Sequence, residues 1–218
     1  FGELVLMDSS NHDWLEGRGP RLSLVAMMDD ATDRLVARFV EHDTTLENLA
    51  TLKVWLSKHG RPLALYTDRH SIFVKTRPYT AEVVHGPAPL TDFGACLEEL
   101  HIEWIAAYSP QAKGRIERVF ETLQDRLVKE MRVAGISSAE GANRFFETVF
   151  ASQYHERFAH LPRESQDAHR TLRRIDLDSA LCLRDLRRVT SDYTLSLDGQ
   201  RWAISRQHVL PGMRLSKL

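Results

Sequence analysis

Three acidic residues occupy positions from which their carboxylates could reach a common ligand. Asp8 ends the apolar run 4–7, and Asp68 ends a second run of the same design, 63–67. A strand that ends in Asp places the carboxylate at the rim of its sheet, half exposed to solvent. Glu117 lies in the first turns of a predicted helix. Two strand-end aspartates and one helix glutamate form a carboxylate set of the kind that holds divalent metal ions through oxygen ligands.

The helix that carries Glu117 is predicted from the spacing of its apolar residues. These recur at helical intervals, so one stripe packs against a core. The stripe consists of Ile116, Val119, Phe120, Leu123, Leu127 and Met131. Three cations, Lys113, Arg115 and Arg118, surround Glu117 in the sequence. The alternative is an ordinary carboxylate at a helix start, favoured there by the macrodipole, and Glu117 taken alone leaves the two interpretations evenly balanced.

Three short motifs follow one another along the chain: Met7-Asp8-Ser9, Tyr66-Thr67-Asp68 and Gly114-Arg115-Ile116-Glu117-Arg118. With a Ser-Pro-Gln lead-in before the third motif, the chain resembles the integrase core of DDE transposases and retroviral integrases, and most of all the transposases of bacterial insertion sequences. The resemblance covers roughly residues 3–160. It departs from the family after Asp68, where Arg69-His70 replaces a frequent Asn-Gly, so no role of that Asn is carried over. The interval between Asp68 and Glu117 is also longer than usual.

The resemblance implies an α/β fold of the ribonuclease-H-like type. The expected sheet is mixed and five-stranded: a three-stranded antiparallel meander is joined by parallel strands, and helices flank it. The implied function is that of a DNA transposase or integrase, which cleaves phosphodiester bonds at the ends of a mobile element and transfers the strand into target DNA. Its partner is therefore DNA, and the protein would form a homo-oligomer on it.

The resemblance also implies roles for individual residues. Asp8, Asp68 and Glu117 would act as the catalytic residues and hold two Mg²⁺ ions, for which Mn²⁺ can substitute. The cations Lys113, Arg115 and Arg118 would hold the phosphate backbone of DNA rather than read bases. Two alternatives stay open: a nuclease of the same fold that cuts without joining, and an idle integrase-like module that only binds DNA. The complete set of three acids disfavours the idle module.

Composition sets wider bounds. The 218 residues suit one main domain with a smaller appendage, and 43% hydrophobic with 27% charged residues describe a soluble globular protein. A formal net charge of −1 is unlike that of a dedicated DNA-binding domain, so we expect only the cations near Glu117 to meet nucleic acid. Two widely separated cysteines, Cys96 and Cys182, and no visible secretory signal fit a reduced, cytoplasmic setting, near the nucleoid when DNA is bound. The start at Phe1 suggests a piece of a longer protein.

The elements expected in the first half explain how the two aspartates meet. Strands over 3–9, 22–28 and 35–40 form the meander. A capping box at 44–47 begins a helix that ends at Gly60. A helix between strands implies a crossover connection, so the strand 63–68 pairs in parallel with the first strand and brings Asp8 beside Asp68.

The rest of the core is less regular. Residues 69–90 read as a long loop, expected to be mobile without DNA. A short helix over 90–100 and a strand over 102–106 follow, and Asp92, the main rival as an active-site acid, is assigned to the start of that helix. After a helix with a core-facing aromatic stripe, the core is expected to end at residue 160. A linker with some helix covers 161–185, and 186–218 resembles the start of a small β-barrel.

Overall fold

The computed structural model describes residues 1–68, 71–73, 90–107, 114–184 and 187–209. The chain divides into two compact units, Phe1–Cys182 and Leu183–Leu218. Most of the loop expected over 69–90 lies outside the described residues, and so does Lys113. The prediction that this loop is mobile therefore stays a prediction.

The first unit is built on a mixed five-stranded sheet in the order β3-β2-β1-β4-β5. Its strands are β1 (Leu4–His12), β2 (Leu22–Asp29), β3 (Leu35–Val40), β4 (Ala64–Thr67) and β5 (Glu103–Ala106). The first three form an antiparallel meander, whereas β4 pairs in parallel with β1 and β5 in parallel with β4. This is the predicted ribonuclease-H-like sheet. β1 is longer than expected because its hairpin with β2 continues to the pair His12–Leu22.

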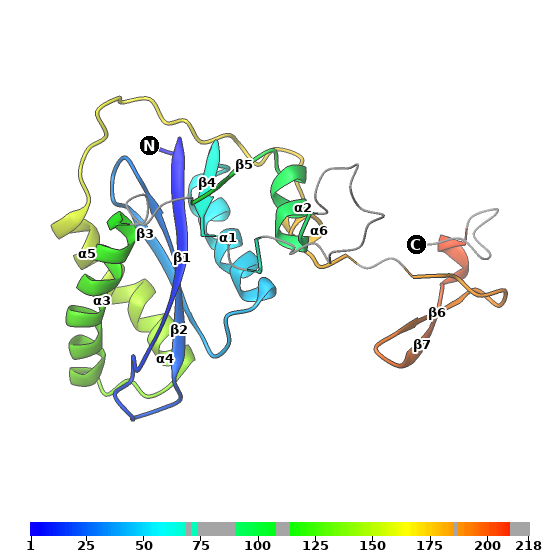
Figure 1. Cartoon of the computed structure of the whole chain (residues 1–218), viewed down its shortest axis with the longest axis horizontal. Coiled ribbons are helices and arrows are strands. Elements are labelled where there is room, and N and C mark those ends of the chain that lie inside the picture. Colours follow the sequence, from blue (N-terminus) through cyan, green and yellow to red (C-terminus); the bar gives the residue numbers. More distant parts are fainter. Residues whose placement is uncertain (69–70, 74–89, 108–113, 185–186, 210–218) are drawn as a thin grey trace, which may run out of the picture. The chain divides into compact units, whose positions relative to one another are not determined.

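Helices cover both faces of the sheet (Figure 1). One layer contains α3 (Gly114–Val133), α4 (Ala139–Phe145), the π-helix η3 (Phe146–Phe150) and α5 (Ala151–Phe158). The other contains α1 (Thr45–His59), α2 (Asp92–Glu99) and α6 (Leu177–Ala180). Side chains alternate between the faces of a strand, so Leu6 joins the core under α3, whereas Val5 and Met7 join the core under α1.

The crossover that makes β4 parallel to β1 begins and ends where the sequence predicts. The hydroxyl of Thr44 accepts a hydrogen bond from the backbone N–H of Glu47 at 3.3 Å, which caps the first turn of α1. Gly60 ends the helix with a φ of 95°, a conformation that favours glycine, and its N–H donates to the carbonyl of Leu56.

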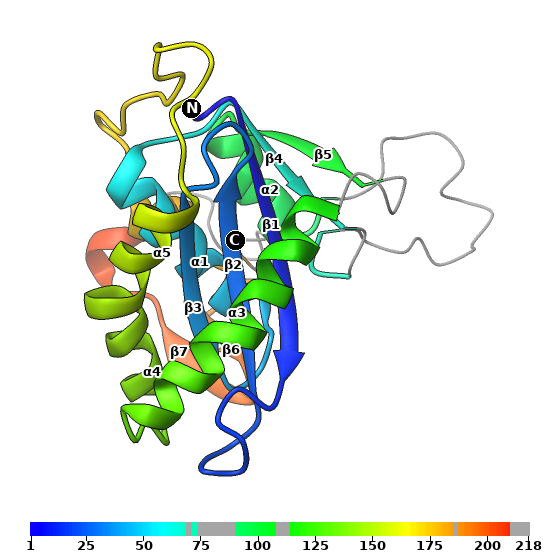
Figure 2. The ribbon, with the colours of Figure 1, turned by 90° about the vertical axis from the view of Figure 1, so that its left-hand side faces the viewer.

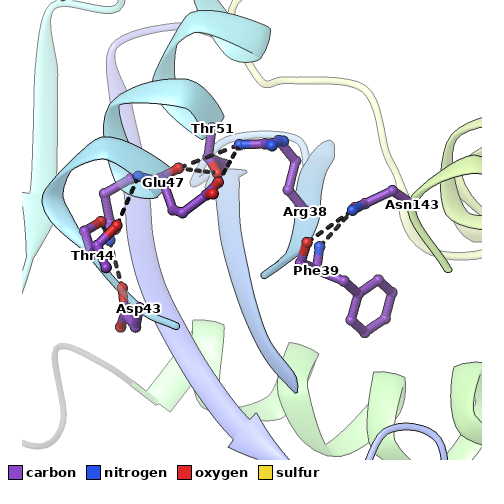
Figure 3. Close-up of polar contacts among 8 residues, drawn as sticks. Arg38, Phe39, Asp43, Thr44, Glu47, Thr51 and Asn143 are labelled. Carbon is purple, nitrogen blue, oxygen red and sulfur yellow. Dashed lines mark hydrogen bonds and ion pairs between the residues drawn. The ribbon is translucent and has the colours of Figure 1, made fainter. Parts of the chain in front are cut away.

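β3 is an edge strand of the sheet, and two side chains from the helical layer bond to its backbone. The amide of Asn143 accepts from the backbone N–H of Phe39 at 2.7 Å and donates to its carbonyl at 2.8 Å (Figure 3). Leu35 lies four residues before Phe39 on β3. Nε2 of His155 is 3.0 Å from its backbone nitrogen and 3.1 Å from its carbonyl oxygen. His155 therefore bonds to the backbone of the edge strand.

The segment after α5 returns to the first unit. Arg61 and Arg170 exchange backbone hydrogen bonds of 2.9 and 2.8 Å. The indole N–H of Trp55 donates to Nε2 of His169 at 3.2 Å, and Leu172 packs against the core under α1. Much of the stretch expected as a linker is thus bound to the core.

In the second unit, β6 (Thr194–Leu197) and β7 (Gln200–Ala203) form an antiparallel hairpin, followed by the 3-10 turn η4 (Arg206–His208). Asp198 and Gly199 have φ values of 50° and 74°, as a tight hairpin turn requires. Asp-Gly between two strand-like runs is a strong hairpin signal in the sequence itself. The small β-barrel remains a prediction, because residues 210–218 lie outside the described part of the chain.

Candidate active site

Asp8 and Asp68 stand level on neighbouring parallel strands. The register between β1 and β4 pairs Leu4 with Ala64 and Leu6 with Tyr66. Each aspartate lies two residues beyond the last of these pairs, so the parallel register brings the two to the same height. Neighbouring strands are about 4.8 Å apart. Both aspartates are partly buried.

A buried hydroxyl group stabilises the end of β4 through hydrogen bonds. Thr67 is fully buried, and its hydroxyl donates to the backbone carbonyl of Asp68 at 2.8 Å. The same hydroxyl accepts from the indole N–H of Trp104, on β5, at 2.9 Å. A chain of two hydrogen bonds therefore fixes the backbone that carries Asp68. Sequence reasoning missed both supporting residues; the available signal was a threonine directly before the strand-end acid.

Glu117 approaches from α3, which lies across the sheet face next to β1 (Figure 2). Gln124 stands two turns after Glu117 and shares its flank of the helix. The side chain of Gln124 donates to the hydroxyl of Ser10 at 3.1 Å, and Ser10 follows Asp8 on the same face of β1. The Glu117 flank of α3 therefore faces the strand that carries Asp8. The Glu117 residue itself is exposed.

The three carboxylates do not form a closed ligand cluster. Across the described ranges, no group of three or more His, Cys, Asp or Glu side chains is close enough to hold a metal ion. The register brings Asp8 level with Asp68, and Glu117 lies on the helix that packs over that face of the sheet. The donor set still fits a hard divalent cation, since all three groups are carboxylates.

Arg115, one of the predicted DNA-binding cations, lies away from that flank. The guanidinium of Arg115 contacts the carboxylates of Asp30 at 3.2 Å and Asp33 at 2.7 Å. Residues two apart in an α-helix point about 160° away from each other, so Arg115 and Glu117 occupy opposite flanks. Lys113 lies outside the described residues.

Arg118 lines a cavity of about 180 Å³ on the Arg115 side of α3, together with Asp33, Tyr154 and Phe158. Burial raises the pKa of Tyr154 to about 12, and the negative charge of Asp33 adds to this effect. Tyr154 therefore stays a neutral phenol even at alkaline pH and supplies no negative charge to Arg118.

A cavity of about 340 Å³ lies along the edge of β3, away from the aspartates. Basic side chains dominate its polar lining, which includes Arg34, Arg38, Lys58, His59 and His155. Among the described residues, its lining holds a single carboxylate, Glu147, and so does not suit a divalent metal ion. No helix among the described residues is both long and apolar enough to cross a membrane.

Sequence comparison adds two curated relatives, although no protein-family model matches the chain. The chain is 39% identical over 216 residues to "Putative transposase y4bF" of Sinorhizobium fredii, an alignment that covers 98% of this chain and 46% of that protein. It is 32% identical over 158 residues to "Transposase for insertion sequence IS1202" of Streptococcus pneumoniae, covering 72% and 33%. The chain thus spans less than half the length of these relatives.

Solved structures share the fold at low sequence identity. The HTLV-2 integrase catalytic core domain, in its trimeric form with magnesium, matches 73% of this chain and 97% of its own, with a TM-score of 0.51 and 14% identity. A chain of the simian T-cell lymphotropic virus intasome, in complex with PP2A regulatory subunit B56 gamma, matches 91% and 64%, with a TM-score of 0.54 and 15% identity. The chain thus resembles two proteins named as transposases and shares the fold of integrase catalytic cores.

Proposed function

We propose that this chain is the catalytic core of a transposase that cleaves DNA at the ends of a mobile element and joins the strand to target DNA. The observation that carries the proposal is the level placement of Asp8 and Asp68 on adjacent parallel strands, under the helix that bears Glu117. Their side chains are the proposed ligands of two Mg²⁺ ions, and Mn²⁺ is an expected substitute. The magnesium in the HTLV-2 integrase core supports this choice of ion.

Bound divalent ions would activate water, or later a DNA 3′-hydroxyl, and stabilise the departing oxygen. The chain's own residues supply the positions. Asp8 and Asp68 are set by strand register and by the hydrogen bonds of Thr67, and Glu117 is set by the packing of α3 on the sheet. No protein nucleophile is required, so the carboxylates act as ligands throughout.

DNA is the proposed partner, with Arg118 and Lys113 as backbone contacts and a homo-oligomer assembled on the element ends. A cytoplasmic location, close to the nucleoid when DNA is bound, belongs to the same proposal. Arg115 is not included among these contacts, because its guanidinium already has two carboxylate partners.

Glu117→Gln tests the catalytic role, since it keeps the shape of the side chain and removes the charge that offsets a divalent ion. In the full-length protein, the variant is expected to lose Mg²⁺-dependent cleavage and strand transfer by at least about 100-fold. Binding of element-end DNA should stay within about twofold, because affinity comes mainly from cations meeting phosphates. Cleavage and gel-shift assays at one salt concentration measure both quantities.

Two further variants calibrate this experiment. Glu121→Gln, one turn later on the exposed surface of α3, is the matched control and should cut normally. Arg118→Ala should weaken DNA binding and reduce the salt dependence of log K by about one unit of slope, with most of the rate restored at saturating DNA. Cleavage by Glu117→Gln at near wild-type rate would reduce Glu117 to a structural carboxylate. Cleavage without joining by the unaltered protein would favour a nuclease.

A further inference from the structure

Arg115 forms a two-pronged contact with the turn between β2 and β3. Its two terminal nitrogens reach different carboxylates, Asp30 at 3.2 Å and Asp33 at 2.7 Å. The fork of the guanidinium suits this geometry, because it presents its donors in fixed directions. A DNA phosphate would have to displace two carboxylates to gain the same guanidinium.

The turn that receives Arg115 is itself tied to the first strand. The backbone N–H of Asp30 donates to the carbonyl of Leu4 at 3.0 Å. The carboxylate of Asp29, fully buried, accepts from the N–H of Gly2 at 2.7 Å and from the hydroxyl of Thr32 at 2.7 Å. The turn is thus a fixed extension of the sheet at the start of β1, the strand that carries Asp8.

A second contact anchors the same turn from the end of α5. The backbone N–H of His160 donates to the carbonyl of Thr32 at 3.0 Å, and its Nδ1 lies 3.5 Å from Asp33. Asp33 has a φ of 55°, a conformation that Asp and Asn adopt more readily than other side chains. The carboxylate that Arg115 contacts at 2.7 Å is therefore held by a backbone with little freedom.

Arg115 lies in the first turn of α3, two residues before Glu117. The first N–H groups of a helix lack partners within the helix, so this turn is intrinsically the easiest to loosen. Ile116 packs its side chain into the core, but an apolar contact fixes rotation about the helix axis less sharply than paired polar groups do. The ion pairs of Arg115 add a directional restraint between this turn and the start of β1.

We propose that Arg115 is a positioning residue, which fixes Glu117 relative to Asp8 through Asp30 and Asp33, rather than a contact to DNA. The inference rests on the proposed function of Glu117. It differs from the phosphate-binding role that the sequence suggested for Arg115. Ion pairs this exposed contribute little to global stability, so the effect should appear in the reaction rate and in the local motion of the helix start.

The test is a double-mutant cycle between Arg115→Met and Asp33→Asn. Methionine keeps much of the apolar stem of arginine, and asparagine tolerates the positive φ of Asp33. Each variant is expected to lower the cleavage rate at saturating DNA by about tenfold, since small misplacements of a catalytic group are costly. The double variant should be no slower than the worse single one, and DNA affinity should stay within about twofold.

Hydrogen exchange supplies a readout that does not depend on activity. The amides of residues 116–120 should exchange faster in both single variants, with the rest of α3 unchanged. The matched control is Lys129→Met with Asp125→Asn, an exposed ion pair four residues apart on the same helix, which should alter neither the rate nor the exchange at the helix start.

The outcomes separate the alternatives. Weaker DNA binding by Arg115→Met, together with stronger binding by Asp33→Asn and additive effects, would overturn the positioning role in favour of a phosphate contact. Unchanged exchange at 116–120 in both variants would overturn it as well. If the unaltered protein shows no metal-dependent cleavage, the proposed function fails by itself, and the exchange data still decide whether Arg115 holds the helix start.

Discussion

The side-chain amide of Asn143 pairs with the backbone of Phe39 as a neighbouring strand would. It satisfies the N–H at 2.7 Å and the carbonyl at 2.8 Å (Figure 3). Because β3 is an edge strand, these two groups would otherwise offer a template to another chain. One helical side chain thus stabilises the fold and blocks one position for sheet extension.

Replacing Asn143 by Leu should therefore have two effects. The loss of two hydrogen bonds and the burial of unpaired backbone groups should reduce the free energy of unfolding by about 2 to 3 kcal/mol. The exposed edge should also raise self-association. Urea denaturation measures the first effect and light scattering against concentration the second. Arg144→Ala, which removes only an exposed ion pair with Glu140, should change neither by a comparable amount.

Thr67→Val tests the hydrogen-bond chain at the end of β4. Valine matches the shape of threonine but leaves the indole N–H of Trp104 without its acceptor. The expected loss of stability is about 1 to 3 kcal/mol, accompanied by slower cleavage because the backbone of Asp68 is released. Thr51→Val is the control: that threonine is also fully buried, but its hydroxyl bonds within α1.

A Thr67→Val protein with normal stability and normal cleavage would show that β4 needs no support from this hydroxyl. If stability falls while cleavage at saturating DNA is unchanged, the hydrogen bonds hold the sheet but do not position Asp68.

His59 gives the fold a dependence on pH. Burial lowers the pKa of His59 from 6.5 to about 4, and the neighbouring basic side chains of His169, Arg34 and Lys58 add to this shift. Between those two pH values, His59 binds more protons in the unfolded chain than in the folded chain. The contribution of neutral His59 to the free energy of unfolding is therefore fully present above pH 6.5 and is lost as the pH falls towards 4. After allowance for solvent screening, His59 should account for about 1 kcal/mol of this loss.

Urea midpoints at pH 7 and pH 4.5 measure the effect. His59→Gln should reduce the difference between the two pH values, and His42→Gln, at an exposed position, should leave it unchanged. An identical pH dependence in wild type and His59→Gln would assign the acid sensitivity to other groups. His155 would then be the first to test, because burial also lowers its pKa.

The sequence predicted the parts of the fold that depend on local signals. The capping of α1 and the crossover it implies follow from short-range patterns. That crossover makes β4 pair in parallel with β1 and so brings Asp8 and Asp68 to the same edge of the sheet. The hairpin turn at Asp198 also follows from a short-range pattern, because tight turns need residues that accept positive φ.

Contacts between distant segments were beyond such patterns. Arg115 and Asp33 are 82 positions apart, and a cation near a candidate acid resembles a DNA contact until its actual partner is seen. The closeness of Thr67 to Trp104 depends on the register of β4 with β5, which no local pattern specifies. The return of residues 168–172 to the core depends in the same way on partners more than a hundred positions earlier.

The π-helix η3 contains about one residue more than an α-helical turn would, and this bears on how the helical layer tolerates a deletion. The N–H of Ala151 bonds to the carbonyl of Phe146, five residues back, so η3 holds about one residue more per turn than an α-helix. Asn143 and His155 are twelve positions apart, yet with that extra residue they lie about three turns apart, on one face. Loss of one exposed residue such as Thr148 would turn η3 into ordinary α-helix and leave both side chains aimed at β3. A one-residue deletion elsewhere between Asn143 and His155 keeps both side chains on this face only if η3 converts to α-helix. The π-helix can therefore absorb the loss of one residue from this part of the chain.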